Sequence, residues 1–435
     1  MNKKFLSAVG LLILSLMLIS SVAVAEEDLE LVSERGSHTE AWKTLMDNFE
    51  QETGTSLNIT QYPYSDYRSQ LMLNFTGGQK NYDVPYISML WYPSFARGGY
   101  LKPLNEIVER NPELKEDMPG LENAYWEDGN LYFIPYMNEL GGVLYRKDLF
   151  NDPEEKKNFK EQYGYELQPP ETLQQYKDIA EFFHRPPDLY GVSLMGQRSI
   201  FLATHFMNRL WARGGELLDD DYKPAFNNEK GIEALKEVKE MFGYASDASK
   251  AHDFQDALTE FTNGKSAMAE LWTTAMFHAN DEENSDIVGD ASFTGFPRPE
   301  EAKDEKRPML YISWGFSVAE STDNPEAAME WIEHVIEKEQ FIEAAPKGTI
   351  PTRLSALEDS ELKSELPWIE PFQEALENGI PTPMFPLIPE GSTIVNQEIA
   401  SLVSLYLTGE KSAQEALSEA ENAIYEILEE NNYYE

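Results

Sequence analysis

Cysteine is absent from this sequence of 435 residues. Its absence excludes disulfide bonds, thiolate metal ligands and cysteine nucleophiles, and also attachment to a membrane through a lipid-modified cysteine. Histidine is scarce, and its six residues are isolated rather than spaced as metal ligands. His205 falls on an apolar helix pattern, where we expect it to pack within the fold. We therefore expect neither a bound metal nor a cofactor.

The common catalytic motifs are also missing. There is no H-E-x-x-H zinc motif, no G-x-S-x-G nucleophile elbow and no glycine-rich phosphate loop. The run Asp219–Asp221 lacks the alternating spacing of a calcium loop and is interpreted as a solvated turn. We therefore expect no catalytic residues. A glycoside hydrolase stays open as an alternative, because many carboxylates are present and the sequence does not give their separation in space.

Basic residues are few, with 35 Lys and Arg against 77 Asp and Glu and a formal net charge of −42. A chain this acidic repels phosphate backbones and anionic membrane surfaces, so we do not expect it to bind nucleic acid. The acidic residues are scattered along helix patterns such as 229–240 and 410–430 rather than collected in one tail. We interpret this acidic surface as halophilic adaptation, because salt screens the repulsion between like charges.

Only one long apolar run is present, and it lies near the start of the chain. Asn2–Lys4 is positively charged, Leu11–Ile19 is apolar, and Ala23–Ala25 consists of small residues. This is the pattern of a secretory signal peptide cleaved after Ala25, with an apolar core too short to span a bilayer comfortably. The sequence therefore predicts an exported, periplasmic protein that is not a lipoprotein.

The region after the signal peptide alternates between the two periodicities of secondary structure. Strand patterns occur at 29–32, 57–59 and 84–87, and helix patterns follow the capping box Ser37-x-x-Glu40 and cover 65–75. The order β-α-β-α-β predicts a mostly parallel sheet covered by helices. Ligands of such sheets bind beyond the carboxyl ends of the strands, which here are 33–36, 62–67 and 88–92.

The stretch 131–150 combines features of a passage between two lobes. Leu131–Ile134 has a strand pattern, Pro135 cannot donate to a sheet ladder, and Gly141-Gly142 allows a sharp turn. A second apolar run, Val143–Tyr145, then leads into the start of a helix. We interpret the stretch as strand, irregular crossing and strand; an internal hairpin is the alternative.

The remainder of the chain continues the α/β pattern without an internal repeat or a flexible linker. Predicted strands lie at 190–194, 266–271, 291–297 and 311–319, and predicted helices at 172–183, 200–211, 231–242, 254–261, 325–336, 392–407 and 412–429.

Aromatic residues gather at predicted loops and strand ends. They are Tyr64, Tyr67, Trp91, Tyr92, Tyr136, Trp272 and Trp314. A sugar ring has an apolar C–H face and a rim of hydroxyl groups, which suit flat aromatic surfaces together with polar side chains such as Arg35, Asn138 and Glu139. Together these residues favour a carbohydrate site, although core packing is the alternative for any one of them.

A series of motifs in a fixed order resembles the family 1 extracellular solute-binding proteins, the maltose-binding-protein-like group that serves ABC sugar importers. The matching pieces are YDVPYISMLWYPSFARGGYLKPL, GNLYFIPYMNELGGVLYRKDLF, ARGGELL with PAFNNEKGIEAL, FTNGKSAMAELW, ISWGFSVAESTDNPEAAMEWI, GTIPTR and GEKSAQEALSEAENAIYEIL. Each motif alone is weakly specific for the family, but the order of all of them over nearly the whole length is a specific match.

The resemblance implies a type II periplasmic-binding-protein fold, with two α/β lobes joined by a multi-stranded hinge. Lobe 1 is expected at 26–135 and 295–343, lobe 2 at 141–290 and 348–435, and the hinge near 136–140, 291–294 and 344–347. Residues 152–170 resemble an insertion. Carried over by position, the ligand is expected to contact Arg35, Trp91, Tyr92, Tyr136, Asn138, Trp272, Trp314 and Arg353. Tyr67 and Glu139 complete the predicted ligand-binding set.

The function implied is capture rather than catalysis. A mono- to trisaccharide or a glycoside would bind between the lobes, and the closed form would dock on the permease of an ABC importer. We expect a monomer with no enzymatic activity. A secreted glycoside hydrolase and a chemosensory binding protein are the alternatives left open.

Overall fold

The computed structural model describes residues 28–36, 38–126 and 128–434. The predicted signal peptide and Ser37 of the first capping box lie outside these residues. Within them, no helix combines the length and apolar character needed to cross a membrane.

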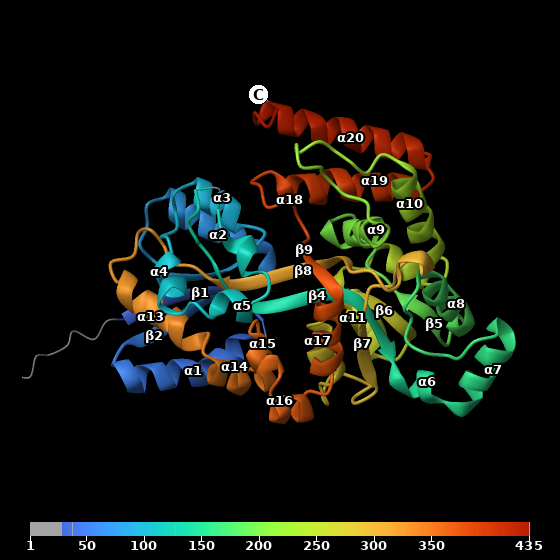
Figure 1. Cartoon of the computed structure of the whole chain (residues 1–435), viewed down its shortest axis with the longest axis horizontal. Coiled ribbons are helices and arrows are strands. Elements are labelled where there is room, and N and C mark those ends of the chain that lie inside the picture. Colours follow the sequence, from blue (N-terminus) through green and yellow to red (C-terminus); the bar gives the residue numbers. More distant parts are fainter. Residues whose placement is uncertain (1–27, 37, 127, 435) are drawn as a thin grey trace, which may run out of the picture.

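Two lobes of helix-covered sheet lie side by side, and strands β4 and β8 pass through both of them (Figure 1). The strands are β1 (Asp28–Glu34), β2 (Ser56–Tyr62), β3 (Val84–Ser88), β4 (Ile134–Arg146), β5 (Tyr190–Ser193), β6 (Ser266–Trp272), β7 (Ala291–Gly295), β8 (Arg307–Phe316) and β9 (Gly379–Pro383).

The strands of the described residues form one sheet in the order β2-β1-β3-β8-β4-β6-β5, with β7 paired to β4 and β9 paired to β8. The parallel pairs are β1 with β2, β1 with β3, β5 with β6, and β8 with β9. The first half of β4 pairs with β8, and its second half pairs with β6 and β7. One continuous strand therefore belongs to the sheets of both lobes.

The predicted division into two strands with an irregular crossing is wrong in part, because β4 runs without interruption through Pro135 and Gly141-Gly142 and is irregular only near Pro135. The sheet absorbs Pro135 by a register shift between Pro135 and Met137. The two glycines permit close approach rather than a turn. A Cβ on Gly142 would lie 2.4 Å from the carbonyl oxygen of Thr294, and one on Gly141 would lie 2.9 Å from the side chain of Leu310.

The return crossing also differs from the prediction, because β8 begins at Arg307 rather than near residue 311. The segment before it packs on the second lobe, where the Phe296 ring lies 6.4 Å from the ring of Tyr176 and 5.3 Å from the guanidinium of Arg209. We infer that the chain returns to the first lobe within β8, and not at residue 295.

Helices of the first lobe follow the predicted pattern closely up to β3. Trp42, Leu45 and Phe49 are buried on one face of α1, which ends before Gly54 with its positive φ of 80°. These helices are α1 (His38–Thr53), α2 (Tyr64–Thr76), α3 (Tyr92–Arg97), α4 (Asn105–Arg110), α5 (Leu114–Asp117), α13 (Pro325–Val335) and α14 (Lys338–Ala344).

Helices of the second lobe include three with complete capping boxes among the described residues, formed by Thr172 with Gln175, Asp253 with Asp256, and Ser412 with Glu415. These helices are α6 (Lys147–Asn151), α7 (Pro153–Tyr163), α8 (Leu173–Phe183), α9 (Ile200–Ala212), α10 (Glu229–Met241), α11 (Phe254–Thr262), α12 (Ala275–Ala279), α17 (Ile369–Asn378), α18 (Gly391–Thr393), α19 (Ala400–Leu407) and α20 (Ala413–Glu430). The predicted helix at 392–407 contains a π-helical stretch, Ile394–Ile399. Helices α15 (Leu354–Leu357) and α16 (Ser360–Glu365) lie near the junction of the lobes.

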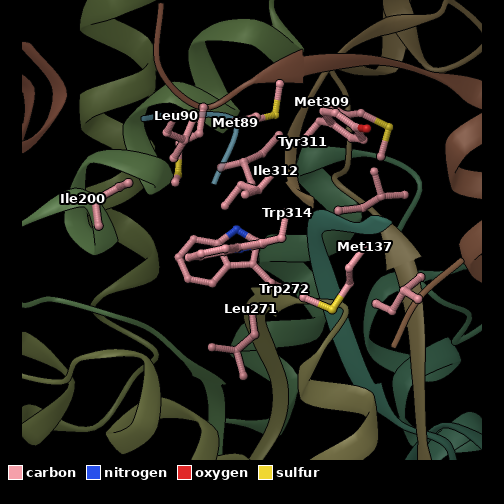
Figure 2. Close-up of a cluster of buried hydrophobic side chains, with 14 of the residues drawn as sticks. Met89, Leu90, Met137, Ile200, Leu271, Trp272, Met309, Tyr311, Ile312 and Trp314 are labelled. Carbon is pink, nitrogen blue, oxygen red and sulfur yellow. The ribbon is translucent and has the colours of Figure 1, made fainter. Parts of the chain in front are cut away.

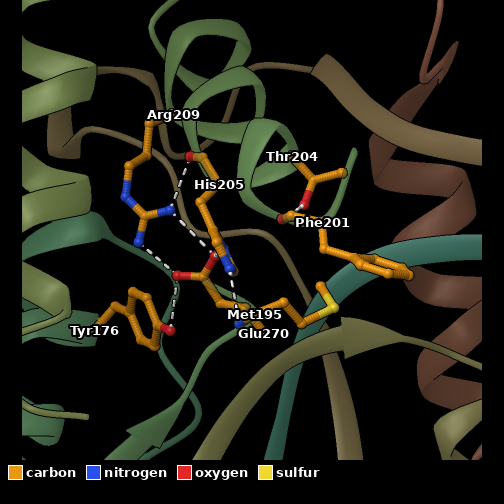
Figure 3. A network of polar contacts seen from close by, with 7 residues as sticks. All are labelled: Tyr176, Met195, Phe201, Thr204, His205, Arg209 and Glu270. Carbon is orange, nitrogen blue, oxygen red and sulfur yellow. Dashed lines mark hydrogen bonds and ion pairs between the residues drawn. The ribbon is translucent and has the colours of Figure 1, made fainter. Parts of the chain in front are cut away.

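A buried polar network ties α8 and α9 to β6 in the second lobe (Figure 3). The Tyr176 hydroxyl donates to Glu270 at 2.9 Å, and Arg209 forms an ion pair with the same carboxylate. The backbone N–H of Met195 donates to Nε2 of His205, so Nδ1 carries the proton and donates it to Glu270 at 2.6 Å. His205 is thus a packed helix residue, as predicted.

Candidate functional site

Four aromatic rings of the first lobe meet where β3 ends beside β8. The ring of Trp91, at the start of α3, lies 5.3 Å from the ring of Trp314 on β8, with the planes inclined by 80°. Tyr67 and Tyr64 from α2 lie 5.8 Å and 6.0 Å from Trp91. Register explains the meeting, because Ser88 at the end of β3 pairs with Trp314. Tyr64 is 51% exposed and forms the outer edge of this group.

The second lobe contributes Trp272, which is the last residue of β6. Its ring stacks on Phe254 of α11 at 5.5 Å and lies 5.9 Å from Phe201 of α9. In Figure 2, Trp272 and Trp314 lie within one cluster of buried side chains drawn from both lobes. Trp91, Trp272 and Trp314 are each at most 8% exposed, so their faces are largely covered in this conformation. A ligand between them therefore requires the lobes to separate first.

Glu139 lies on β4, in the crossing between the lobes, and is buried. The Thr274 hydroxyl, from the segment after β6, donates to Glu139 Oε2 at 2.7 Å. Burial raises the pKa of Glu139 to about 7, and the Thr274 hydrogen bond opposes part of this rise. The hydrogen bond joins the crossing strand to the lobe that carries Trp272.

Glu34 ends β1, at the carboxyl edge of the sheet where a ligand is expected. Burial and the nearby charge of Glu139 raise its pKa to about 8. Its neighbour His38 is buried against Trp42 and Tyr86, and burial lowers the pKa of the imidazole to about 3. A neutral His38 does not offset the charge of Glu34. Both carboxyl groups therefore gain protons near neutral pH.

Several predicted ligand residues lie outside this group. Tyr92 is buried with its hydroxyl donating to the carbonyl oxygen of Asn123 at 2.9 Å, and its ring stacks on Phe133. Tyr136 is fully buried between Phe316 and Phe341. Both side chains pack in the core of the first lobe in this conformation.

The three predicted polar residues lie in different surroundings. Asn138 is fully buried and accepts a hydrogen bond from Tyr311 at 2.6 Å. Arg35 is exposed in the bend after β1. Arg353 donates to Asp117 of α5 at 2.5 Å and to the carbonyl oxygen of Ile336 at 3.2 Å. Arg353 thus ties the segment before α15 to the first lobe.

A polar contact also joins the lobes at their outer edge. Arg97 of α3 donates to Glu390, which precedes α18, and to the hydroxyl of Tyr433 near the C-terminus, each at 3.4 Å. The Tyr433 hydroxyl donates to Glu390 at 2.7 Å. Burial and the bond to Glu390 raise the pKa of Tyr433 to about 12. We refer to Arg97, Glu390 and Tyr433 as the rim contact.

The prediction of ligand residues did not include Glu34 and Thr274. The sequence signal for Glu34 is its position at the carboxyl end of the first strand, next to Arg35. Thr274 follows Trp272 closely, but its partner Glu139 is 135 residues away. Within the described ranges, no three His, Cys, Asp or Glu side chains are grouped in a way that could hold a metal ion.

Comparison with known proteins finds one matching family model and several curated relatives. Residues 35–340 match the family described as bacterial extracellular solute-binding protein. A probable ABC transporter-binding protein of Deinococcus radiodurans is 23% identical over 78% of each chain. A mannitol-binding protein of Pseudomonas aeruginosa is 24% identical over 82% of each chain.

Solved structures share the architecture over nearly the full length. An ABC transporter solute-binding protein of Agrobacterium radiobacter K84, in complex with ribitol, is 24% identical and superposes with a TM-score of 0.78, covering 92% of this chain and 98% of that one. The maltose-bound MalE3 of T. maritima is 22% identical, with a TM-score of 0.77 over 92% and 100% of the two chains. These likenesses confirm the predicted two-lobed, type II periplasmic-binding-protein fold.

Proposed function

The chain belongs to the bacterial extracellular solute-binding protein family, and from this premise we propose that it captures a carbohydrate between its lobes and delivers it to an ABC importer. The ligand class is a mono- to trisaccharide, a sugar alcohol or a glycoside. The names of the relatives support this class, because they include a mannitol-binding protein and structures bound to ribitol and maltose.

The observation that carries the proposal is the placement of tryptophans from both lobes along β4, the strand that carries the buried Glu139. Trp314 pairs with Met137, and Trp272 pairs with Gly141. Trp91 and Trp314 are in ring contact in the first lobe, and Figure 2 shows Trp314 in one buried cluster with Trp272 of the second lobe. Aromatic faces bind the C–H surface of a sugar, and carboxylates accept hydrogen bonds from its hydroxyl groups. We propose Trp91, Trp314, Trp272, Glu139 and Glu34 as the main ligand contacts.

The remaining predicted residues take supporting roles in this proposal. Tyr67 holds the Trp91 ring in place, because its hydroxyl is fixed by hydrogen bonds to the carbonyl oxygens of Val32 and Tyr86. Asn138 and Tyr136 stiffen the crossing strand from within the core. Arg35 reaches the ligand only if its exposed side chain folds toward the opened site.

Opening and closing would take place at β4 and β8, since these strands run through both lobes. A ligand that contacts Trp91 and Trp272 at once favours the closed form by its differential affinity for the two states. The rim contact between Arg97 and Glu390 would reform on closure and mark the closed surface that a permease recognises.

The location of the protein and the salt concentration in which it functions are also part of the proposal. We propose that the protein is exported to the periplasm after cleavage behind Ala25, acts there as a monomer, and functions in high salt. The absence of cysteine supports a form without a lipid anchor, and the net charge of −42 supports the halophilic setting.

Isothermal titration of the mature protein in high salt against sugars, sugar alcohols and glycosides tests the proposal. We expect saturable binding of one or two of them, with the ligand recovered unchanged by chromatography. If the folded protein binds none of these compounds, the proposal of a carbohydrate ligand is refuted. Recovery of cleaved glycoside would instead support the hydrolase alternative, with Glu34 and Glu139 as its first candidates for acid and base.

A further inference from the structure

A cavity of about 600 Å³ lies within the second lobe, away from the aromatic site. Its walls come from α9, the end of β7, the start of β8, α17 and the segment before α8. None of the predicted sugar-binding residues lines it. Its volume falls within the range of sites that hold small molecules.

Basic side chains are more frequent in the lining of this cavity than in the chain as a whole. Acidic residues outnumber basic ones about two to one overall, but four basic side chains line the cavity against three acidic ones. The basic residues are Arg298, Lys303, Lys306 and Arg307, and the acidic residues are Glu171, Asp304 and Glu374. Lys303 pairs with Glu300 and Arg307 with Glu305, so Arg298 and Lys306 are the lining cations without a carboxylate partner among the described residues. Such unpaired cations attract an anion.

The two arginines lie close enough to affect each other. Arg298 donates to the carbonyl oxygens of Lys303 and Asn378 at 3.1 Å and 2.7 Å. Burial, together with the charge of Arg307, lowers the pKa of Arg298. Arg307 pairs with the exposed carboxylate of Glu305. The carbonyl bonds of Arg298 fix its guanidinium without neutralising it, so an anion between the two arginines would relieve their repulsion.

Two buried polar atoms on the cavity residues have no hydrogen-bond partner among the described residues. One is the donor Nε of Arg307, and the other is the acceptor Oδ1 of Asn208. Asn208 lies on α9 and is only 7% exposed. Because buried polar groups are normally hydrogen-bonded, both unpaired atoms indicate that a ligand or a water molecule binds here. An anionic oxygen satisfies the arginine, and a hydroxyl group satisfies the asparagine.

We propose that this cavity is a second binding site, for a small hydroxylated anion that carries one carboxylate or phosphate group, such as a sugar acid or a sugar phosphate. The arginines bind the anionic group, and Asn208 accepts a hydrogen bond from a hydroxyl group. Glu171 and Glu374 lie on the same walls, so we expect the ligand to carry one anionic group rather than several. The rings of Tyr145 and Phe296 supply the apolar surface for the carbon skeleton.

Calorimetric titration of the mature protein with gluconate, glucose 6-phosphate, glucose and inorganic phosphate tests this site at constant ionic strength. We expect gluconate or glucose 6-phosphate to bind more tightly than either glucose or inorganic phosphate does at this site. Tryptophan fluorescence should stay unchanged, because no tryptophan lines the cavity. A change in fluorescence on anion binding would place the anion at the aromatic site instead and overturn the proposal.

Paired variants separate binding from folding. Arg307→Gln should weaken anion binding by about tenfold or more, whereas Arg185→Gln, which breaks an exposed pair with Glu155 on the same lobe, should leave it unchanged. Glu374→Gln should strengthen binding, an effect that misfolding does not produce. No heat with either anion, or equal affinity in the Arg307→Gln and Glu374→Gln variants, would refute the second site. Binding of sugar at the aromatic site is measured separately and does not depend on this outcome.

Discussion

Trp91 and Trp314 meet edge to face, with ring centroids 5.3 Å apart and planes inclined by 80°. Trp91 follows the end of β3. Trp314 lies on β8, which passes through both lobes. The pair therefore links the carboxyl edge of the first sheet to the strand that connects the lobes. A ligand that touches Trp314 is in contact with the element about which the lobes would move.

Loss of one aromatic face should weaken sugar binding. We expect Trp91→Ala and Trp272→Ala each to lower affinity by roughly tenfold or more, because an aromatic contact adds about 0.5–1.5 kcal/mol beyond its buried area. Calorimetric titration measures the effect. Trp126→Ala is the control, since Trp126 packs against Tyr92 outside the aromatic site. Unchanged affinity in both site variants would remove these tryptophans from the ligand contacts.

Stability should depend on pH through Glu34, whose pKa is raised to about 8. Between its ordinary pKa and about 8 the folded protein holds more protons than the unfolded chain, so the free energy of unfolding falls as pH rises. We expect Glu34→Gln to remove part of this fall, on the order of a few kcal/mol from about pH 5 to about pH 9. Urea unfolding at several pH values measures it.

Glu40→Gln, on the exposed pair with Lys43 of α1, is the matched control for Glu34→Gln and should leave the pH profile unchanged. If wild type and Glu34→Gln show the same slope of unfolding free energy against pH, the Glu34 carboxyl is ordinarily charged in the folded protein.

The buried network around Glu270 should be required for the stability of the second lobe. Burial favours protonation of Glu270, but the charge of Arg209 and the hydrogen bonds from Arg209 and His205 outweigh it and hold the pKa of this carboxyl well below its usual range. Glu270→Gln leaves Arg209 without a counter-charge and should lower the free energy of unfolding by about 3–5 kcal/mol. Glu155→Gln should cost about 1 kcal/mol or less. Equal costs in chemical denaturation would show that the network is not stabilising.

The rim contact should favour the closed form. Arg97→Gln removes an ion pair between the lobes and should raise the sugar dissociation constant by about two- to fivefold, because exposed pairs contribute up to about 1 kcal/mol. Arg110→Gln, which breaks pairs within the first lobe, is the control. Calorimetry gives the constants, and small-angle scattering shows whether the apo protein becomes more open. Identical values for Arg97→Gln and Arg110→Gln would contradict a role for the rim contact.

Salt should stabilise the protein if its acidic surface is a halophilic adaptation. Screening reduces repulsion among like charges, so we expect the free energy of unfolding to fall when salt is diluted from molar to millimolar concentration. Denaturation with urea, which is uncharged, measures this. Full stability at very low salt would contradict the halophilic interpretation.

The sequence was most informative where periodicity is strong. The strands and helices from β1 to β3 lie where predicted, because alternating and helical spacings are local properties. Gly141-Gly142 was misread, since local sequence does not distinguish a glycine needed for turning from one needed for close contact with Leu310 and Thr294. Strand β9 was missed because its prolines argue against a strand, although they are tolerated where it pairs with β8.

The site was harder to predict than the fold. Trp91 and Tyr92 are adjacent and both aromatic, but Trp91 contacts Trp314 and Tyr92 packs on Phe133. Only the direction in which α3 begins separates the two residues, and this depends on tertiary packing. Glu34 was missed for a similar reason, because burial by distant segments, and not its neighbours in sequence, sets the pKa of its carboxyl group.

The central claim is that a sugar binds between Trp91 and Trp314 on one lobe and Trp272 on the other. A tryptophan-fluorescence titration of the mature protein in high salt tests it most directly, with a panel of sugars, sugar alcohols and sugar-derived compatible solutes. We expect a saturable change in tryptophan fluorescence with one or two of these compounds, and we expect the Trp91→Ala and Trp272→Ala variants to lose it. No response from the folded protein to any of them would contradict it.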